Sequence, residues 1–428
     1  MPEIRKFVTT ISLLFLWIIL ITAIFVIEQK YRHPDVTPGD FHSLEQYLEA
    51  QFNQAYKTKN LGCGGFAVID RGKIRLERGF GIANHINARV DVDSTLFLLS
   101  SLSKAVTAWG VIKLVEEQCI KSLDEPIFRY LQRWSFPGKD TLAKYITSRH
   151  LLSHTAGFVD GYGHSGVESE NDLQSIEESL SGPNDANQGA SHPATAVFRP
   201  GTEMSYSSAG YGVLQLLIEE KTGKPFHAYM RDNVLLPLGM RQSTYRLEDV
   251  VRENRSAHLA AQYDLEMKPH PHRYYANMAG VSLRASIHDL ALFAAAYSSN
   301  AILSQKSIEE FYTPQPGTSM TWGLGHTLYM ENSENKFVFG HGGGAFPASG
   351  SEMRINPTTG NAIVLVATGS QNFISPLADD WLYWETGKST FDIRNVIRRR
   401  GLAGALIMLG GCIGIVLWQI KRKNRKGK

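Results

Sequence analysis

Apolar residues recur three and four positions apart through residues 98–118 (LLSSLSKAVTAWGVIKLVEEQ). This spacing places them on one side of a helix, so the run predicts a helix packed into a core. The residues that follow the pattern are Leu102, Val106, Trp109, Ile112 and Val115. Similar patterns predict further helices over residues 42–57, 207–223, 285–297 and 376–385.

Strand-like runs occur near both ends of the chain. Residues 66–81 read as a hairpin around Arg71-Gly72-Lys73, and β-rich segments separated by turn residues recur at 336–341, 351–357 and 361–369. The region between them, roughly residues 120–300, is mainly helical in character. We therefore expect an α+β fold in which one antiparallel sheet is built from both ends of the domain, with a helical subdomain inserted.

Two uncharged segments flank this domain. Residues 7–27 and 401–420 are 21 and 20 residues long and mostly apolar, which is enough to span a bilayer. A cleaved signal peptide is the alternative for the first segment, but no small-x-small cleavage site follows it. The expected organisation is a membrane anchor at 1–29, a linker at 30–41, the folded domain at 42–390, a transmembrane helix at 401–420 and a basic tail at 421–428.

Charge is distributed unevenly along the chain. The ends are basic, whereas residues 34–392 hold 30 basic and 39 acidic residues, a net charge of −9. An acidic middle argues against nucleic-acid binding. Eight basic residues lie beyond the two apolar segments and six face the middle, which favours both termini inside and the domain outside. We expect a bacterial cytoplasmic membrane, with the domain facing the periplasm or the exterior.

Cysteine and histidine provide little further chemistry. Cys63 and Cys119 either pair or remain free thiols, and Cys412 lies within the second apolar segment. The fourteen histidines form no ligand-spaced cluster backed by cysteine or carboxylates. We expect no metal and no cofactor, and the oligomeric state remains open.

A serine and a lysine stand three residues apart at the start of the 98–118 run. Ser101 and Lys104 would share one face of a helix, which places a base beside a hydroxyl that is a weak nucleophile by itself. The alternative is a helix cap and a surface lysine. The same spacing recurs at Ser333 and Lys336 in a polar turn, so the pair needs support from elsewhere in the chain.

Two further short motifs follow in order. Tyr206-Ser207-Ser208 lies at the start of the 207–223 helix, and His341-Gly342-Gly343 lies at the end of a predicted strand. Each motif is weak alone, because Tyr297-Ser298-Ser299 and His164-Ser165-Gly166 copy them elsewhere. The order of the three motifs, each in a suitable element, is much more specific than any one of them.

With these motifs the chain resembles the serine β-lactamase and penicillin-binding protein superfamily, and is most similar to its class C branch. That branch includes DD-peptidases, esterases and mitochondrial β-lactamase-like proteins. The resemblance covers roughly residues 44–385 and includes the phrases STLFLLSSLSK, SLDEPIFRYL, RHLLSHTAG, LLPLGM and GVSLRASIHDLALF. It implies a β-lactamase/transpeptidase-like fold.

The resemblance also implies catalytic roles. Ser101 would be the acylated nucleophile, and Lys104 and Tyr206 would share the work of the general base. Their unperturbed pKa values are both near 10 (~10.4 and ~10), so burial and proximity must lower one or both. The oxyanion hole would use the backbone N–H groups of Ser101 and Gly344, and such a donor contributes about 3–4 kcal/mol to transition-state stability.

Ser208, His341 and Gly343 would contact the substrate, and two of them depart from the common family pattern. Ser208 stands where Asn is common, which argues against efficient β-lactam hydrolysis. His341 stands where Lys is common, and a largely neutral histidine binds a substrate carboxylate less strongly. His154, in the LLSHTAG phrase, has a structural rather than a catalytic role in this interpretation.

The favoured function is a membrane-anchored serine hydrolase acting on a small-molecule or peptide substrate, as a peptidase, esterase or β-lactamase-like enzyme. The alternative is a non-catalytic or slowly deacylating penicillin-binding sensor that uses the same pocket. The intact set of Ser101, Lys104 and Tyr206 favours the enzyme. A transporter or channel is excluded because two apolar segments flank one large polar domain.

Overall fold

The computed structural model describes residues 34–388, except residues 85, 87, 139, 161–162, 187–192, 333 and 371–372. Both predicted membrane spans and the basic tail lie outside these residues. Within them, no helix combines the length and the apolar character needed to span a bilayer. Residues 41–381 form one compact unit, which holds the sheet, the core and the site described below.

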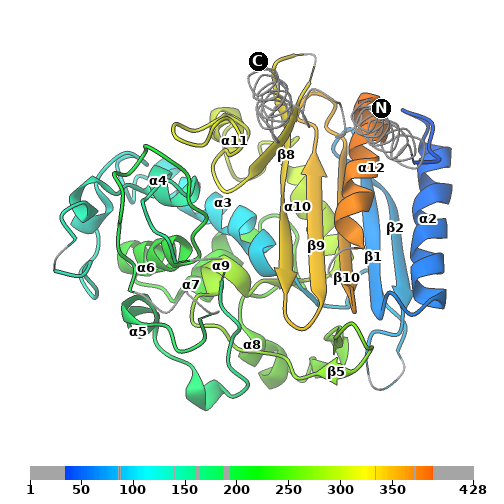
Figure 1. Cartoon of the computed structure of the whole chain (residues 1–428), viewed down its shortest axis with the longest axis horizontal. Helices are drawn as coiled ribbons and strands as arrows, with labels where there is room; N and C mark the ends of the chain where they lie inside the picture. The colour runs from blue at the N-terminus through cyan, green and yellow to red at the C-terminus, as the bar shows by residue number, and fades with distance from the viewer. Residues whose placement is uncertain are drawn as a thin grey trace, which may run out of the picture. The chain divides into compact units, whose positions relative to one another are not determined.

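The centre of this unit is a six-stranded antiparallel sheet with the order β2-β1-β10-β9-β8-β7 (Figure 1). The pairing of β1 with β10 joins the first hairpin to the last strands, which confirms the prediction of one sheet assembled from both ends. β7 was not predicted. The strands are β1 Cys63–Asp70, β2 Lys73–Gly81, β7 Thr327–Glu331, β8 Phe337–Ala345, β9 Ser349–Ile355 and β10 Ala362–Thr368.

Both faces of the sheet are covered, and this explains the composition of its inner strands. β9 and β10 are buried at every position, so they lack the alternation of a strand that has one face in water. Helix α10 (Ile287–Ala296) packs on β1, β2 and β10, and α2 (Phe41–Lys57) packs on β1 and β2. In Figure 1, α12 (Ile374–Thr386) crosses in front of β10, with α10 behind the sheet. Tyr47 of α2 donates a hydrogen bond of 2.6 Å to Asp380 of α12.

The helical region lies between β2 and β7 in the chain, as predicted. Besides α10, its helices are α3 Ser103–Glu116, α4 Ser148–Leu152, α5 Ile176–Ser181, α6 Ala209–Thr222, α7 Phe226–Met230, α8 Leu247–Arg252, α9 Met278–Val281 and α11 Gln305–Phe311. Short 3-10 segments are η1 Ser100–Leu102, η2 Ile127–Arg129, η3 Ala143–Tyr145, η4 Glu170–Asp172 and η6 Ser256–His258, and η5 Arg231–Leu235 is a π-helix. Two-stranded pairs join β3 Phe97–Leu98 to β6 Arg284–Ala285 and β4 Gln262–Tyr263 to β5 Pro269–His270.

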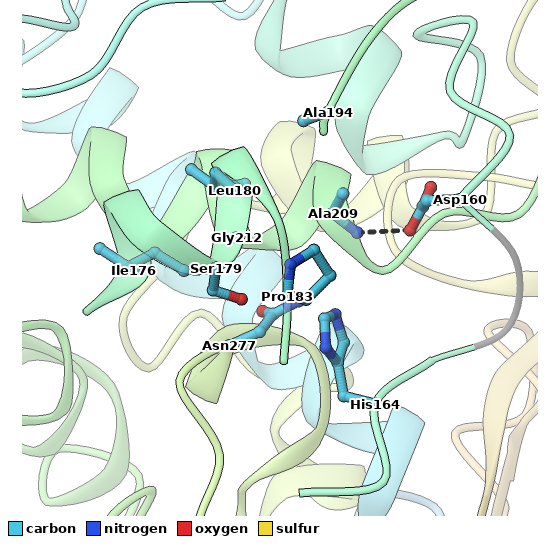
Figure 2. Close-up of a pocket in the computed structure, with 10 residues that line it drawn as sticks. All are labelled: Asp160, His164, Ile176, Ser179, Leu180, Pro183, Ala194, Ala209, Gly212 and Asn277. Carbon is cyan, nitrogen blue, oxygen red and sulfur yellow. Dashed lines mark hydrogen bonds between the residues drawn. The ribbon is translucent and has the colours of Figure 1, made fainter. Parts of the chain in front are cut away.

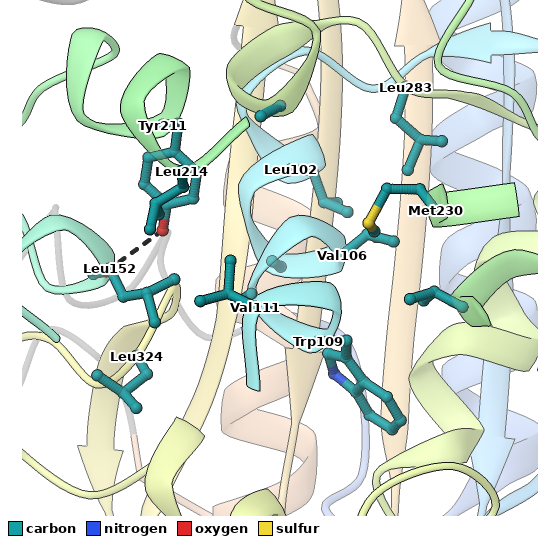
Figure 3. Packing of buried hydrophobic residues seen from close by; sticks show 14 of the residues in the cluster. Leu102, Val106, Trp109, Val111, Leu152, Tyr211, Leu214, Met230, Leu283 and Leu324 are labelled. Carbon is teal, nitrogen blue, oxygen red and sulfur yellow. Dashed lines mark hydrogen bonds between the residues drawn. The ribbon is translucent and has the colours of Figure 1, made fainter. Parts of the chain in front are cut away.

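Helix α3 lies within the core. It is buried on nearly every side rather than along one stripe, and Figure 3 shows Leu102, Val106, Trp109 and Val111 packed among residues of other elements. The ring of Trp109 lies 5.0 Å from that of Tyr297, measured between centroids. A helix that is apolar all round is expected in such a central position.

The start of this helix differs from the prediction. Residues 98–118 were expected to be helical throughout, but Leu98 pairs with Arg284 as strand β3, and Ser101 lies in the 3-10 segment η1. The physical reason is a hydrogen bond of 2.8 Å from Leu99 N–H to the carbonyl of Leu283, which holds the chain in a strand-like position before the helix begins. Ser101 therefore belongs to a tight turn that precedes α3.

Candidate active site

The turn that carries Ser101 is held from two sides. Ser351 of β9 donates its hydroxyl to the carbonyl of Leu99 at 2.7 Å, and Ser103 accepts the N–H of Leu283 at 3.0 Å. Ser100 has a φ of +51°, a left-handed conformation that is uncommon for a residue with a side chain. The turn is thus fixed between the sheet and the segment after α9, with Ser101 half-buried.

Lys104 lies beside Ser101, as the spacing predicted. Its Nζ is 3.2 Å from Ser101 Oγ and donates a hydrogen bond of 2.8 Å to the carbonyl of Gly280. The side chain is fully buried, and no carboxylate among the described residues lies within 4 Å of it. Burial lowers the pKa of Lys104 to about 7, opposed only by the more distant charge of Asp160. A substantial fraction of this amine is therefore neutral near pH 7.

Tyr206 lies against Lys104 and His154. Lys104 Nζ is 5.0 Å from the centre of the Tyr206 ring, and the ring of His154 stacks on it with centroids 4.2 Å apart. His154 accepts the N–H of Ser207 at Nδ1, at 3.1 Å, and burial lowers its pKa well below the ordinary value. The histidine is therefore a neutral support for the Tyr206 segment, in keeping with a structural role.

The glycines after His341 allow β8 to pass close to the Ser101 turn. β7 pairs with β8 only as far as Gly340, so β7 leaves the following residues of β8 uncovered on that side. A Cβ at Gly343 would lie 2.2 Å from the carbonyl oxygen of Leu99, so no larger residue fits there. Gly344, the next residue, is exposed, and a Cβ there would meet only an ordinary contact at 3.8 Å. The structure thus brings Gly344 next to the turn that carries Ser101.

His341 lies in the same site, close to the ring of Tyr206, and its imidazole is neutral. It is 3% exposed, and its Nδ1 lies 2.5 Å from the carbonyl of Gly342. A carbonyl only accepts, so Nδ1 carries the proton and Nε2 is bare in the neutral ring. Burial and the nearby Lys104 lower the pKa of His341 to about 3. The position that is often a lysine in the superfamily that the sequence resembles is therefore uncharged here.

Ser208 lies behind the exposed part of the site. Its side chain is fully buried, and its predicted contact with substrate stays a prediction. Its N–H donates to Asp160 at 3.0 Å, and its carbonyl accepts from Asn277 at 2.7 Å. The reason for its burial is its place at the start of α6, where these two side chains hold the backbone.

Asp160 is a residue that sequence reasoning missed. Its Oδ2 also accepts the N–H of Ala209 at 2.8 Å (Figure 2), while its buried Oδ1 has no hydrogen-bond partner among the described residues. A cavity of about 10 Å³, room for a single water, lies beside it and is also lined by His164 and Asn277. Nothing in the local sequence marks Asp160, because its role depends on α6 and Lys104 coming close in space. The same holds for the carbonyl of Gly280.

The copies of the three motifs lie elsewhere. Lys336 is only partly buried and pairs with Glu334 at 3.3 Å, whereas Tyr297 is a core residue 2.6 Å from His326. His164 pairs with Asp185 at 2.8 Å. The structure therefore brings together only the first set, Ser101, Lys104, Tyr206, His341 and Gly343.

Cys63 and Cys119 are both free thiols in the structure, so the pairing left open by the sequence is not formed. Within the described part of the chain, no three His, Cys, Asp or Glu side chains converge as metal ligands do.

The family comparison agrees with this geometry. A model of the family described as Beta-lactamase matches residues 48–388. The chain belongs to the β-lactamase family. As expected for this family, the fold is β-lactamase/transpeptidase-like, with helices around an antiparallel sheet.

The proteins similar to this β-lactamase-family chain include an esterase and a putative penicillin-binding protein. The chain is 32% identical over 211 residues to esterase EstB of Burkholderia gladioli, covering 47% of this chain and 52% of the esterase. It is 28% identical over 296 residues to the putative penicillin-binding protein PbpX of Bacillus subtilis, covering 66% and 67%. The match thus spans about half of one relative and two thirds of the other. Hydrolases such as esterases are represented among them.

Solved structures of the same fold include a penicillin-binding protein homologue from Pyrococcus abyssi, described as octameric. It has a TM-score of 0.65 and 23% identity, with 82% of this chain and 79% of that chain covered. A D-amino acid amidase from Ochrobactrum anthropi has a TM-score of 0.63 and 20% identity, with 80% and 98% covered. At sequence identities of 23% and 20%, these two likenesses show that the fold is shared.

Proposed function

We propose that this protein is a membrane-anchored serine hydrolase that acts on ester or amide substrates through an acyl-enzyme on Ser101. The observation that carries the proposal is the buried Lys104, whose Nζ lies 3.2 Å from Ser101 Oγ and whose pKa is lowered to about 7. A neutral amine at hydrogen-bond distance from a hydroxyl is a suitable general base.

In the first step, Ser101 Oγ attacks the substrate carbonyl carbon and its proton passes to Lys104 Nζ. The negative charge that develops on the carbonyl oxygen is stabilised by the N–H groups of Ser101 and Gly344. Collapse of the tetrahedral intermediate breaks the bond to the leaving alcohol or amine. That group takes the proton, relayed from Lys104 through the Tyr206 hydroxyl.

In the second step, water attacks the acyl-enzyme and gives its proton to the same Lys104 and Tyr206 pair. The new intermediate releases a carboxylic acid and returns the proton to Ser101 Oγ. A positioned base of this kind contributes about 10²–10⁴ in rate.

The substrate class follows from the uncharged His341. A neutral ring provides no fixed cation for a substrate carboxylate, so esters and amides without an obligatory carboxylate are favoured over penicillins and peptide C-termini. The names of the esterase and amidase relatives are in keeping with this choice. A panel of short esters, neutral amides, a D-Ala-D-Ala peptide and a chromogenic cephalosporin tests it, with the esters and amides expected to turn over fastest.

The apolar segments at 7–27 and 401–420 support the membrane anchoring, with the domain outside and both basic ends inside. We expect the full chain to remain in the membrane fraction after alkaline carbonate extraction. Release into the supernatant contradicts the anchoring without affecting the proposed chemistry.

Intact-protein mass spectrometry tests the nucleophile. We expect a fluorophosphonate to add once to the wild type and not at all to Ser101→Ala. The matched control is Ser333→Ala, the serine of the second Ser-x-x-Lys spacing, which should label like wild type. Label that persists on Ser101→Ala contradicts the assignment. A stable penicillin adduct without turnover of any substrate in the panel supports the sensor instead.

A further inference from the structure

A second cavity, of about 260 Å³, lies apart from the Ser101 site. It is formed by the segments around α8 and α9 and by the loop before α5, and none of the three proposed catalytic side chains lines it. Its wall is mainly apolar and aromatic, and includes Leu173, Tyr245, Tyr274, Tyr275 and Met278. A cavity of this size, with an apolar wall and few polar groups, is typical of a small-molecule site.

The cavity contains a buried arginine without an acidic partner. Arg284 is 1% exposed, and no carboxylate among the described residues lies within 4 Å of its guanidinium. Its Nη1 donates to the carbonyl of Ser282 at 3.1 Å and its Nη2 to the carbonyl of Arg273 at 2.9 Å. Its buried Nε has no hydrogen-bond partner in the described structure. A guanidinium has five N–H donors, so several remain for a ligand.

Neighbouring groups compensate this charge only from a distance. Glu248 also lines the cavity and its charge acts on Arg284, but its nearest cation is Arg246 at 3.6 Å. Burial, with the charge of Arg284 as a second cause, lowers the pKa of His272 to about 4, so this ring is neutral. Burial likewise lowers the pKa of His227, which lines the cavity. A buried charge without a partner is costly, and an anionic ligand in this position removes the cost.

We propose that this cavity is a second binding site, for a small carboxylate with an apolar body. The carboxylate accepts hydrogen bonds from the free donors of Arg284, whose planar guanidinium suits a carboxylate. The apolar body lies among Tyr245, Tyr275 and Met278. An inorganic oxyanion fits less well, because it leaves the apolar part of the wall, formed by Leu173, Leu247 and Met278, without a contact. The proposal does not depend on the Ser101 chemistry.

Titration calorimetry with benzoate tests the site on the full chain in detergent. We expect one benzoate per chain, at least tenfold weaker binding of the neutral isostere benzamide, and at least tenfold weaker binding of benzoate to Arg284→Gln. The matched control is Arg252→Gln, an exposed arginine of α8 outside the cavity wall, which should bind like wild type. Blocking Ser101 with a fluorophosphonate should leave benzoate binding unchanged, which separates this site from the proposed active site.

Leu173→Trp provides a second variant that fills the cavity and leaves Arg284 in place. It should weaken benzoate binding at least tenfold, and it decides the matter if Arg284→Gln does not fold. Any of three results overturns the proposal: no saturable benzoate binding, unchanged affinity in a folded Arg284→Gln, or phosphate that binds while benzoate does not.

Discussion

Two buried cations, Lys104 beside the Ser101 turn and Arg284 in the second cavity, have similar surroundings and different chemistry. Each is at most 1% exposed and donates to backbone carbonyls, and neither has a carboxylate within 4 Å among the described residues. Burial lowers the pKa of both. The lysine reaches a pKa of about 7 and exchanges its proton near neutrality, whereas an arginine remains charged because its ordinary pKa is above ~12.

Burial thus gives the two side chains different uses. An isolated lysine in an apolar environment becomes a neutral base, suited to accept a proton from Ser101. An isolated arginine in the same kind of environment remains a cation and attracts an anion. Arg354, a third buried cation, differs from both because it forms an ion pair with Glu352 and lies 3.6 Å above the ring of Tyr329.

The largest effect is expected from Lys104→Met, which keeps the volume of the side chain and removes the amine. The rate constant kcat/KM should fall by about 10²–10⁴, because the proton of Ser101 loses its acceptor. The matched control is Lys113→Met on the same helix. Lys113 pairs with Glu117 at 2.9 Å, and its replacement should leave kcat/KM unchanged. Steady-state kinetics, with near-UV circular dichroism as a check on folding, makes the measurement. Activity within threefold of wild type would remove Lys104 from the mechanism.

The next largest effect is expected on stability, where the two buried arginines Arg354 and Arg284 should differ. Arg354→Met should lower the free energy of unfolding by about 3–5 kcal/mol, because it leaves the buried Glu352 without a cation. Arg284→Met should change it by less than about 1.5 kcal/mol, since the lost hydrogen bonds are offset by removal of an unpaired buried charge. Denaturant unfolding of both variants makes the comparison. A larger loss in Arg284→Met than in Arg354→Met would show that Arg284 is compensated within the protein.

The smallest effect is a shift of a pH profile. For the wild type, kcat/KM should rise through pH 7 as Lys104 loses its proton. The negative charge of Asp160 raises the pKa of Lys104, so Asp160→Asn should lower it and move this limb by about 1 unit to lower pH. The amide oxygen of Asn still accepts the N–H groups at the start of α6.

Asp185→Asn is the matched control for this shift. Asp185 is also a buried acid, but it pairs with His164 and does not act on the charge of Lys104. The pH dependence of kcat/KM for both variants makes the measurement. A limb that stays in place in Asp160→Asn, or that moves equally in Asp185→Asn, would contradict the electrostatic role of Asp160.

Much of the fold was predictable from the sequence because it depends on local patterns. The helix at α2, the hairpin of β1 and β2, and the strands β8, β9 and β10 follow from periodicity and turn residues that act over a few positions. The start of α3 and the strand β7 were missed. The start of α3 depends on a partner distant in the chain, since Leu98 pairs with Arg284. β7 forms a hairpin with the neighbouring strand β8, with an irregular register that the sequence pattern did not reveal.

The candidate site likewise has features that the sequence predicted and features that it did not. Sequence alone was enough to identify Ser101, Lys104, Tyr206 and His341 as one set, because the order of three short motifs carries the family resemblance. It also indicated a neutral residue at position 341. Asp160, the carbonyl of Gly280 and the burial of Ser208 were not predictable, because each depends on which elements meet in space.

The sequence by itself therefore determined the chemical groups, their order and most of the elements that carry them. Tertiary structure decided what those groups do. The two Ser-x-x-Lys spacings are equivalent as sequence, yet Lys104 is fully buried while Lys336 is only partly buried and paired with Glu334. The physical reason is that a pKa depends on desolvation and neighbouring charge, which arise only when distant segments pack together.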